Sequence, residues 1–284
     1  MNDNCFCFKN SVLDLNGIPK VMGILNVTPD SFSDGSQFYG IDRAVEHALL
    51  MHKNGAGIID IGGESTRPGA KLISSEEEIN RVVPVVEVLK KQRPDIIISV
   101  DTTKSSVAHE ALEAGADIIN DISGLRYDPE IADVVADHKA GLVLMHTRGT
   151  PENMLKMTDY GNLIQEISTF LVNAAYTAEK KGVKKESIII DPGIGFAKDH
   201  LQNLEILNKI SDFNGLGYPL LVGPSRKSFI GEILKQSDPE KRVIGTAAVV
   251  GWLSVNKVDF VRVHDVKEMV EIISLIESII KITL

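Results

Sequence analysis

Short apolar runs rich in β-branched residues recur along the chain and predict its strands. They cover 21–25, 57–61, 96–100, 117–119, 142–145, 188–190, 220–222 and 260–263. Because they lack the polar alternation of a strand with one exposed face, we expect strands buried on both faces, as in a parallel sheet covered by helices. The pattern therefore predicts an α/β fold.

Segments with helical periodicity lie between these runs, at 42–54, 75–92, 104–114, 160–181 and 265–282. Ser75 precedes three glutamates and is the expected N-cap of its helix, because acidic residues are favourable near the positive end of the helix dipole. Lys180, Lys181 and Gly182 suit a helix end. The apolar segment 243–255 predicts a buried helix, too short for the roughly 20 residues that cross a bilayer.

Eight alternating units without a Gly/Ser/Pro-rich linker favour a closed (β/α)8 TIM barrel over a doubly wound sheet, which usually has fewer strands. We expect 1–284 to form a single barrel domain. The residues before Lys20 precede the first unit and predict a short N-terminal capping segment, a hairpin across the bottom of the barrel.

Charge limits the partners that this chain can attract. Lys and Arg number 30 against 39 Asp and Glu, which gives a formal net charge of −9. Such a chain has no basic field to draw it onto nucleic acid or an anionic membrane, so we expect neither partner. An anionic ligand must instead meet a local basic site.

Two further features favour a cytoplasmic protein. Polar residues interrupt 1–17, which lacks the continuous apolar stretch of a signal peptide. The only cysteines, Cys5 and Cys7, are too close in sequence for an ordinary disulfide and too few for a zinc site. We expect reduced thiols with no assigned role.

Nearly every predicted strand ends in polar residues on its C-terminal side, the face that carries active sites in barrels. Carboxylates and an amide follow strands three, four and six, at Asp101, Asn120 and Asp191. Cations gather after strand seven and at the end of strand eight. Because acceptors suit the donor-rich edge of a heterocycle and cations suit an anion, we expect a bipolar pocket for a phosphorylated ring.

Other polar residues at these ends have a simpler explanation. Thr102, Thr103, Ser105, Asp121 and Asp265 are expected to cap helices or hold turns. His146 is expected to be a hydrogen-bonded structural histidine, since no His/Cys/Asp cluster has the spacing of a zinc site.

Five sequence blocks resemble the dihydropteroate synthases. Residues 22–35 read MGILNVTPDSFSDG and 62–69 read GGESTRPG, and the shorter blocks 99–102, 225–228 and 262–265 read SVDT, SRKS and RVHD. The resemblance spans nearly the whole chain and implies a (β/α)8 fold and a homodimer formed through late helices. It also implies that 6-hydroxymethyl-7,8-dihydropterin diphosphate and p-aminobenzoate are joined, giving 7,8-dihydropteroate and pyrophosphate.

The resemblance also implies roles for individual residues. The pterin would contact Asp101, Asn120, Asp191, Lys227, Met145 and Phe196. The diphosphate would contact Asn26, Thr66, Arg262 and His264, and Asn26 would also hold Mg2+, the one expected cofactor. Phe32, Thr66, Arg67, Pro68, Ser225 and Arg226 would bind p-aminobenzoate. The implied catalytic residues are Asp101, Lys227, Asp30 and Arg67.

The implied chemistry suits these residue types. Loss of diphosphate leaves a positive charge on the pterin, which Asp101 and Asp30 can stabilise, while cations stabilise the leaving group. Because the arylamine is neutral near pH 7, positioning should matter more than a general base. The loops 26–40 and 64–73 could close over both substrates and exclude water.

Two other functions remain open at this stage. A pterin-dependent methyltransferase would share Asp191 and Asn120, but it would need no diphosphate site of the kind that Arg262, His264 and Lys227 suggest. A non-catalytic pterin-binding paralogue would keep the fold without turnover. The departures from the family pattern, at Ile194, Ala197 and Arg148, remove none of the implied contacts, although the role of Arg148 is undefined.

Overall fold

Parallel strands form the centre of the computed structural model, which describes residues 5–28, 37–66 and 69–282. The strands are β3 Lys20–Asn26, β4 Ile58–Gly62, β5 Ile98–Asp101, β6 Ile118–Asp121, β7 Gly141–Met145, β8 Ile188–Asp191, β9 Leu221–Val222 and β10 Phe260–Val263. They lie side by side in the order β8-β7-β6-β5-β4-β3-β10-β9. A parallel bridge from Ile190 to Leu220 joins the two ends, so the sheet nearly closes into the predicted TIM barrel.

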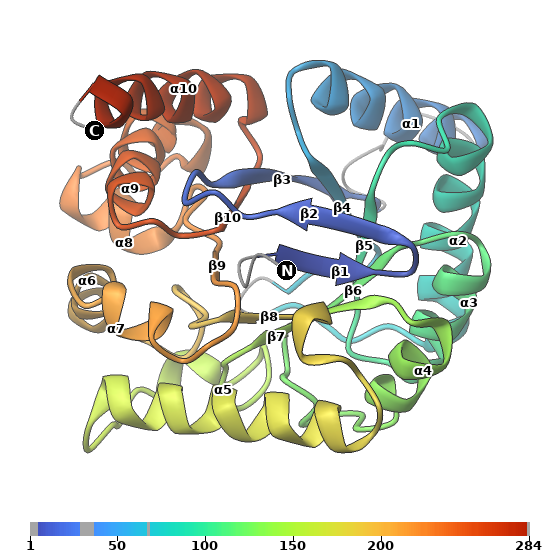
Figure 1. The fold of residues 1–284 in the computed structure, drawn as a ribbon, viewed down its shortest axis with the longest axis horizontal. Coiled ribbons are helices and arrows are strands. Elements are labelled where there is room, and N and C mark those ends of the chain that lie inside the picture. The colour runs from blue at the N-terminus through green and yellow to red at the C-terminus, as the bar shows by residue number, and fades with distance from the viewer. Residues whose placement is uncertain (1–4, 29–36, 67–68, 283–284) are drawn as a thin grey trace.

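Helices surround this sheet (Figure 1). They are α1 Gln37–Lys53, α2 Ser75–Gln92, α3 Ser105–Glu113, α4 Ile131–His138, α5 Leu163–Lys180, α6 His200–Asn208, α7 Ser211–Asn214, α8 Ser228–Ile233, α9 Val243–Val255 and α10 Val266–Ile282, with short 3-10 turns at Met154–Lys156, Lys185–Ser187 and Pro239–Arg242. The five predicted helical segments correspond to α1, α2, α3, α5 and α10. The alternation of strands and helices is therefore confirmed.

Two details of the helices differ from the prediction. Ser74, not Ser75, is the N-cap of α2: it is extended, and its Oγ accepts a hydrogen bond from the Glu77 backbone N–H at 3.2 Å. The segment 243–255 forms α9, but only one of its faces is buried. Ile244 is 82% exposed and Trp252 48% exposed, because an outer helix packs against the barrel along one side only.

The predicted N-terminal capping segment is confirmed as an antiparallel hairpin of β1 Cys5–Phe8 and β2 Ser11–Asp14, which lies across the barrel (Figure 1). Phe6 and Phe8 are buried against residues at the amino ends of the strands, including Phe260, whose ring meets that of Phe6 edge-on at 5.8 Å. Burying each phenylalanine contributes roughly 2–3 kcal/mol. The hairpin therefore closes the end of the barrel opposite the polar strand ends.

A second, larger core lies between the strands and the helices, and it includes Ile59, Val100 and Leu144. No helix in the described ranges is long and apolar enough to cross a membrane. Because apolar side chains pack on both sides of the strands, the polar side chains are concentrated at the carboxyl ends of the strands.

Candidate active site

Strand register brings several of the predicted site residues into one row at the carboxyl ends. Asn26 pairs with Gly62, Gly62 with Asp101, and Asp101 with Asn120. Two strands further on, Met145 pairs with Asp191. Residues separated by more than a hundred positions thus share one rim of the barrel.

A buried ion-pair network joins three strands of this rim. Arg262 donates from Nε to Asp60 Oδ2 at 2.5 Å and from Nη2 to Asp101 Oδ2 at 2.7 Å. The same Asp60 oxygen accepts from Asn120 Nδ2 at 3.2 Å. Burial raises the pKa of Asp101, and the nearby carboxylate of Asp60 adds to this, while Arg262 opposes it. The arginine therefore holds a cluster of carboxylates that repel one another.

Asp60 is a site residue that the sequence analysis missed. It is fully buried, and none of the described residues donates a hydrogen bond to its Oδ1. The available signal was an acidic residue inside the apolar run 57–61, where a strand buried on both faces should carry none.

Asp191 ends β8 and is held by the turn that follows. Its Oδ1 accepts the Gly193 N–H at 2.7 Å, and burial raises its pKa to about 6. Gly193 has φ +69°, and a Cβ there would lie 2.0 Å from the carbonyl oxygen of His146. Only glycine fits this turn, which orients the carboxylate.

Lys227 and Phe196 lie together near Asp191. Lys227 Nζ is 4.0 Å from the centroid of the Phe196 ring, a cation–π contact. Burial lowers the pKa of Lys227 to about 8, although Asp191 and Asp101 oppose the shift. The buried side chain of Met145 lies against the Gly193 turn, so the predicted pterin residues form one group.

Lys198 holds the loop that carries Phe196, and it was not among the predicted site residues. Its buried Nζ lies 3.0 Å from His146 Nδ1 and 2.9 Å from the carbonyl oxygens of Gly193 and Phe196. Burial lowers the pKa of Lys198 well below its usual value and that of His146 to about 2. His146 is thus the structural histidine that was expected, and no sequence pattern marks Lys198.

Ser225 and His264 are hydrogen-bonded across β9 and β10. Ser225 Oγ accepts the His264 backbone N–H at 3.1 Å and lies 2.9 Å from His264 Nδ1. Burial lowers the pKa of His264 to about 3, with Arg226 and Arg262 adding to the effect. When the serine hydroxyl donates to Nδ1, a neutral His264 has its proton on Nε2 and can donate to an anion.

Arg226 is paired rather than free. Its Nη2 and Nε donate to the two carboxylate oxygens of Asp265 at 2.7 and 3.1 Å. Asp265 was expected to cap a helix or hold a turn, and it lies directly before α10, where its carbonyl oxygen accepts the Met269 N–H; its pairing with an arginine is an additional contact. Asp121 does hold a turn, accepting from the N–H groups of Ser123 and Leu125.

The role of Arg148 is structural in this chain. Its guanidinium lies 3.6 Å from the centroid of the Tyr160 ring, pairs with Glu166 and donates to the Asp159 carbonyl. These contacts tie the β7–α5 loop to the start of α5. They explain a charged residue where the family pattern has uncharged ones.

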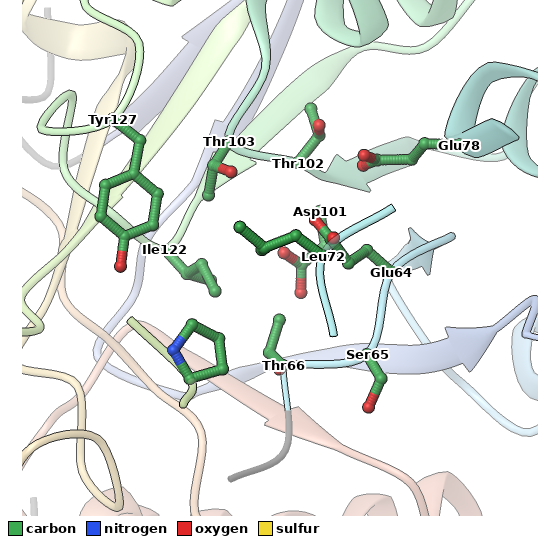
Figure 2. A pocket seen from close by; sticks show the side chains of 11 residues that line it. Glu64, Ser65, Thr66, Leu72, Glu78, Asp101, Thr102, Thr103, Ile122 and Tyr127 are labelled. Atoms are coloured by element: carbon green, nitrogen blue, oxygen red, sulfur yellow. The ribbon is translucent and has the colours of Figure 1, made fainter. Parts of the chain in front are cut away.

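A cleft of about 340 Å³, counted with the space continuous with solvent, opens beside Asp101. Figure 2 shows its lining, in which Thr66 lies below Asp101, and Thr103, Ile122 and Tyr127 form another side. Four predicted residues, Asp30, Phe32, Arg67 and Pro68, lie outside the described residues.

The described residues include no group of three His, Cys, Asp or Glu side chains that could hold a metal. The predicted magnesium ligand Asn26 lies at the carboxyl end of β3, and its Oδ1 would be 3.8 Å from a Cβ added to Gly62. A single amide oxygen next to Asp101 suits Mg2+ that arrives with phosphate oxygens and water, rather than in a cage made by the protein alone.

Known proteins resemble this chain over most of its length. The profile of the family described as pterin binding enzyme matches residues 22–264. A dihydropteroate synthase from Synechocystis is 51% identical over 91% of this chain and 89% of its own. A dihydropteroate synthase structure from Clostridium difficile, determined with pteroic acid, is 44% identical and superposes with a TM-score of 0.88 over 94% of this chain and 98% of that one.

A Xanthomonas albilineans dihydropteroate synthase with 4-aminobenzoic acid is 41% identical, with a TM-score of 0.88 over 94% of this chain and 95% of that one. The matches extend from the first barrel strand to the last. The chain therefore belongs to the pterin binding enzyme family and, within it, to the dihydropteroate synthases.

Proposed function

We propose that the protein joins the methylene carbon of 6-hydroxymethyl-7,8-dihydropterin diphosphate to the amine of p-aminobenzoate, releasing pyrophosphate and 7,8-dihydropteroate. The observation that carries this proposal is that one rim holds hydrogen-bond acceptors for a pterin, at Asp191 and Asn120, and donors for a diphosphate, at Arg262 and His264. The pteroic acid and 4-aminobenzoic acid complexes of similar synthases support the same two ring systems.

The pterin would bind where acceptors and an apolar surface meet. Asp191, oriented by Gly193, would accept from the amino-pyrimidine edge, and Asn120, held by Asp60, would assist it. Met145 and Phe196 would pack on the ring, and Lys227 would donate to the ring oxygen. The cation–π contact keeps the ammonium group beside the space that the ring would occupy.

The diphosphate would bind next to the pterin, to Arg262, His264, Thr66 and Asn26. Asn26 would help to hold Mg2+, which would supply charge neutralisation for the departing diphosphate. The network around Arg262 matters here, because two carboxylates keep its guanidinium in place before the substrate arrives. His264 would donate from Nε2, since its Nδ1 faces Ser225.

The reaction needs charge stabilisation and positioning. The carbon–oxygen bond breaks with its electron pair leaving on the diphosphate, and Asp101 with Asp30 would stabilise the cation that remains. The neutral arylamine then attacks the carbon and loses a proton to solvent. Phe32, Thr66, Arg67, Pro68, Ser225 and Arg226 would frame p-aminobenzoate, and Lys227 and Arg67 would support the charge separation.

The test is a coupled assay of pyrophosphate release with both substrates and Mg2+. We expect one pyrophosphate for each 7,8-dihydropteroate formed, and no release when p-aminobenzoate or free divalent metal is withheld. Substrate binding without release would leave only the non-catalytic alternative. Methyl transfer from a folate, without pyrophosphate release, would favour the methyltransferase alternative.

A homodimer is also part of the proposal. The exposed apolar residues of α9 and α10 include Ile244, Trp252, Leu275 and Ile279, on two helices that pack together (Figure 1). An apolar patch on neighbouring outer helices is typical of an interface between copies. We expect sedimentation to give twice the 31.0 kDa mass of the chain, and Ile244→Asp to shift it toward the monomer.

A wild-type protein that sediments as a monomer at micromolar concentration would contradict the dimer.

We also infer a cytoplasmic location, where Cys5 and Cys7 would remain the free thiols that the structure has. Alkylation of both thiols in freshly lysed cells would support this, and their recovery as an intermolecular disulfide would count against it.

A further inference from the structure

The loop between β4 and α2, which carries Thr66, is anchored at both of its ends. At its start, the Gly63 carbonyl oxygen accepts from Arg81 Nη1 of α2 at 2.8 Å. Glu64 Oε1 then accepts the backbone N–H of Ile73, at the other end of the loop, at 2.7 Å. One carboxylate thus closes the loop across nine positions in the sequence.

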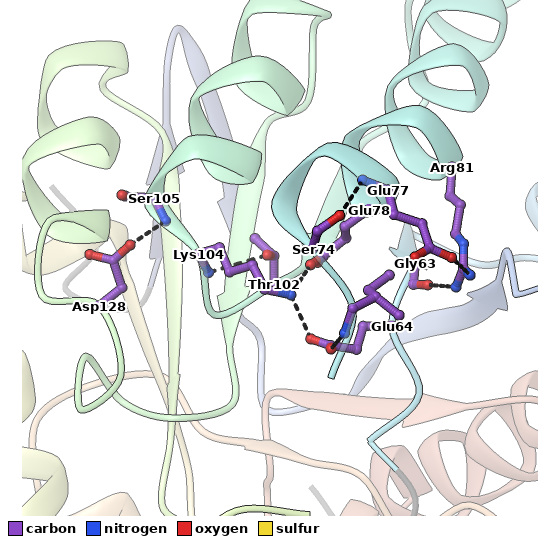
Figure 3. A network of polar contacts seen from close by, with 11 residues as sticks. Gly63, Glu64, Ser74, Glu77, Glu78, Arg81, Thr102, Lys104, Ser105 and Asp128 are labelled. Atoms are coloured by element: carbon purple, nitrogen blue, oxygen red, sulfur yellow. Dashed lines mark hydrogen bonds and ion pairs between the residues drawn. The ribbon is translucent and has the colours of Figure 1, made fainter. Parts of the chain in front are cut away.

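Lys104, in the β5–α3 connection, joins this loop to α2. Its Nζ donates to Glu64 Oε2 at 2.7 Å and also to Glu78. The Thr102 hydroxyl oxygen accepts the Lys104 backbone N–H at 3.3 Å. Figure 3 shows the lysine between the two glutamates, with the α2 N-cap residue Ser74 nearby.

Electrostatics makes this arrangement depend on the lysine. Glu78 is 1% exposed, and burial raises its pKa, although the hydrogen bond from Lys104 opposes the shift. Burial lowers the pKa of Lys104, but its bonds to Glu64 and Glu78 more than offset this and raise it. One ammonium group therefore serves two carboxylates that would otherwise repel each other.

The network also forms one wall of the candidate active site. Glu64, Thr66, Glu78 and Asp101 all line the cleft (Figure 2). Lys104 follows Asp101 by three residues, so the strand end that carries the carboxylate leads directly into the anchor. A shift of Lys104 or Glu64 would change where Thr66 lies relative to Asp101.

We propose that Lys104, through Glu64 and Glu78, is a positioning residue that holds Thr66 in register with Asp101 for p-aminobenzoate. This rests on the proposed function for the identity of the substrate. Lys104 itself contacts no substrate. Its effect should fall mainly on p-aminobenzoate and less on the pterin diphosphate, whose ring would be bound by Asp191 and which would meet the loop only at Thr66.

The first test uses Lys104→Met/Glu78→Leu, which removes both charges of the pair, so that Glu78 is not left buried without its cation and α2 can still pack. We expect KM for p-aminobenzoate to rise roughly tenfold and KM for the pterin diphosphate to rise by less, about threefold, because Thr66 would also contact the diphosphate. Glu64→Ala, which leaves Lys104 in place but removes the hydrogen bond to Ile73, should change the two KM values in the same way. Lys104→Arg should restore most of the wild-type KM.

Limited trypsin digestion tests the anchor without substrates. Lys71 lies exposed within the loop, and cleavage after it should speed up roughly tenfold in Lys104→Met/Glu78→Leu and in Glu64→Ala, because the open loop becomes more populated. Lys90→Met is the matched control: it removes a lysine that pairs with Asp117 at 2.6 Å and donates to the Ile96 carbonyl. It should change neither KM nor cleavage at Lys71.

Wild-type KM and wild-type cleavage in both loop variants would overturn the proposal, even if their thermal stability fell. The proposal would also be overturned if Lys90→Met changed the two KM values as the loop variants do. A wild-type protein that releases no pyrophosphate would refute the proposed function instead, and the trypsin digestion would still decide whether Lys104 anchors the loop.

Discussion

Replacing Asp191 with asparagine should lower kcat/KM for the pterin diphosphate about a thousandfold. The asparagine NH2 group would then face the hydrogen-bond donors of the pterin, so buried donors on both sides would lack an acceptor. The change keeps the shape of the side chain, and its Oδ1 can still accept the Gly193 N–H. Steady-state pyrophosphate release at varied pterin substrate, with calorimetric binding, measures the loss.

Asp259→Asn is the control for this substitution. Like Asp191, Asp259 accepts a backbone N–H, that of Leu220, at 2.9 Å, and burial raises its pKa. Asp259 differs in location, because it lies just before β10, at the opposite end of the strand from Arg262. We expect its kcat/KM to stay within about twofold of the wild type. An active Asp191→Asn variant would remove Asp191 from the pterin site.

Two buried carboxyl groups should set the acid limit of activity. Asp191, with a pKa of about 6, and Asp101, with a pKa of about 7, lose their negative charges below those values. Lys227, with a pKa of about 8, loses its positive charge above pH 8. The profile of kcat/KM for the pterin substrate should therefore be bell-shaped between these values. A flat profile between pH 5 and pH 7 would contradict the role of Asp191.

The charges of Asp191 and Lys227 that activity needs should lower the stability of the folded protein. The raised pKa of Asp191 means that the folded state binds its proton more tightly than the unfolded chain, so this group lowers stability as pH rises from the usual 3.8 to about 6. The lowered pKa of Lys227 makes stability rise with pH from about 8 to 10.5. Both charges thus carry a stability cost between pH 6 and 8, where they are needed.

The second large effect is expected at Arg262. Arg262→Met should lower the free energy of unfolding by about 3–5 kcal/mol, because it leaves Asp60 and Asp101 buried without their cation. It should also abolish measurable pyrophosphate release, since the diphosphate loses its main cationic partner. Urea unfolding measures the first loss and the coupled assay measures the second.

Two further variants separate the causes. Asp60→Asn added to Arg262→Met removes one unpaired charge and should recover part of the stability but none of the activity. Arg226→Met breaks the pair with Asp265, in which the arginine side chain is 26% exposed, and should cost less stability. Unchanged unfolding of Arg262→Met would show that the buried network does not depend on its arginine.

Local pattern was sufficient to predict the barrel and much of its rim. The apolar run 188–190 sets the strand β8 and places Asp191 at its end, and the same holds for Asp101 after 96–100. Strand ends meet at one rim because parallel strands share a direction, so strand order alone brings Asn26, Asp101 and Asn120 together. The roles assigned to Asp30, Phe32, Arg67 and Pro68 remain predictions.

The partners of each charged group were decided by the tertiary structure alone. Asp60 and Arg262 are 202 positions apart, and Lys104 and Glu64 are 40 apart. Helical periodicity of 243–255 likewise could not show which face of α9 would stay exposed. Secondary structure follows from interactions within a few residues, whereas ion pairing and burial follow from which surfaces the fold brings together. The sequence by itself therefore determined the eight-stranded barrel and its polar rim, while only the packing of distant strands and loops decided which charges at that rim hold one another in place.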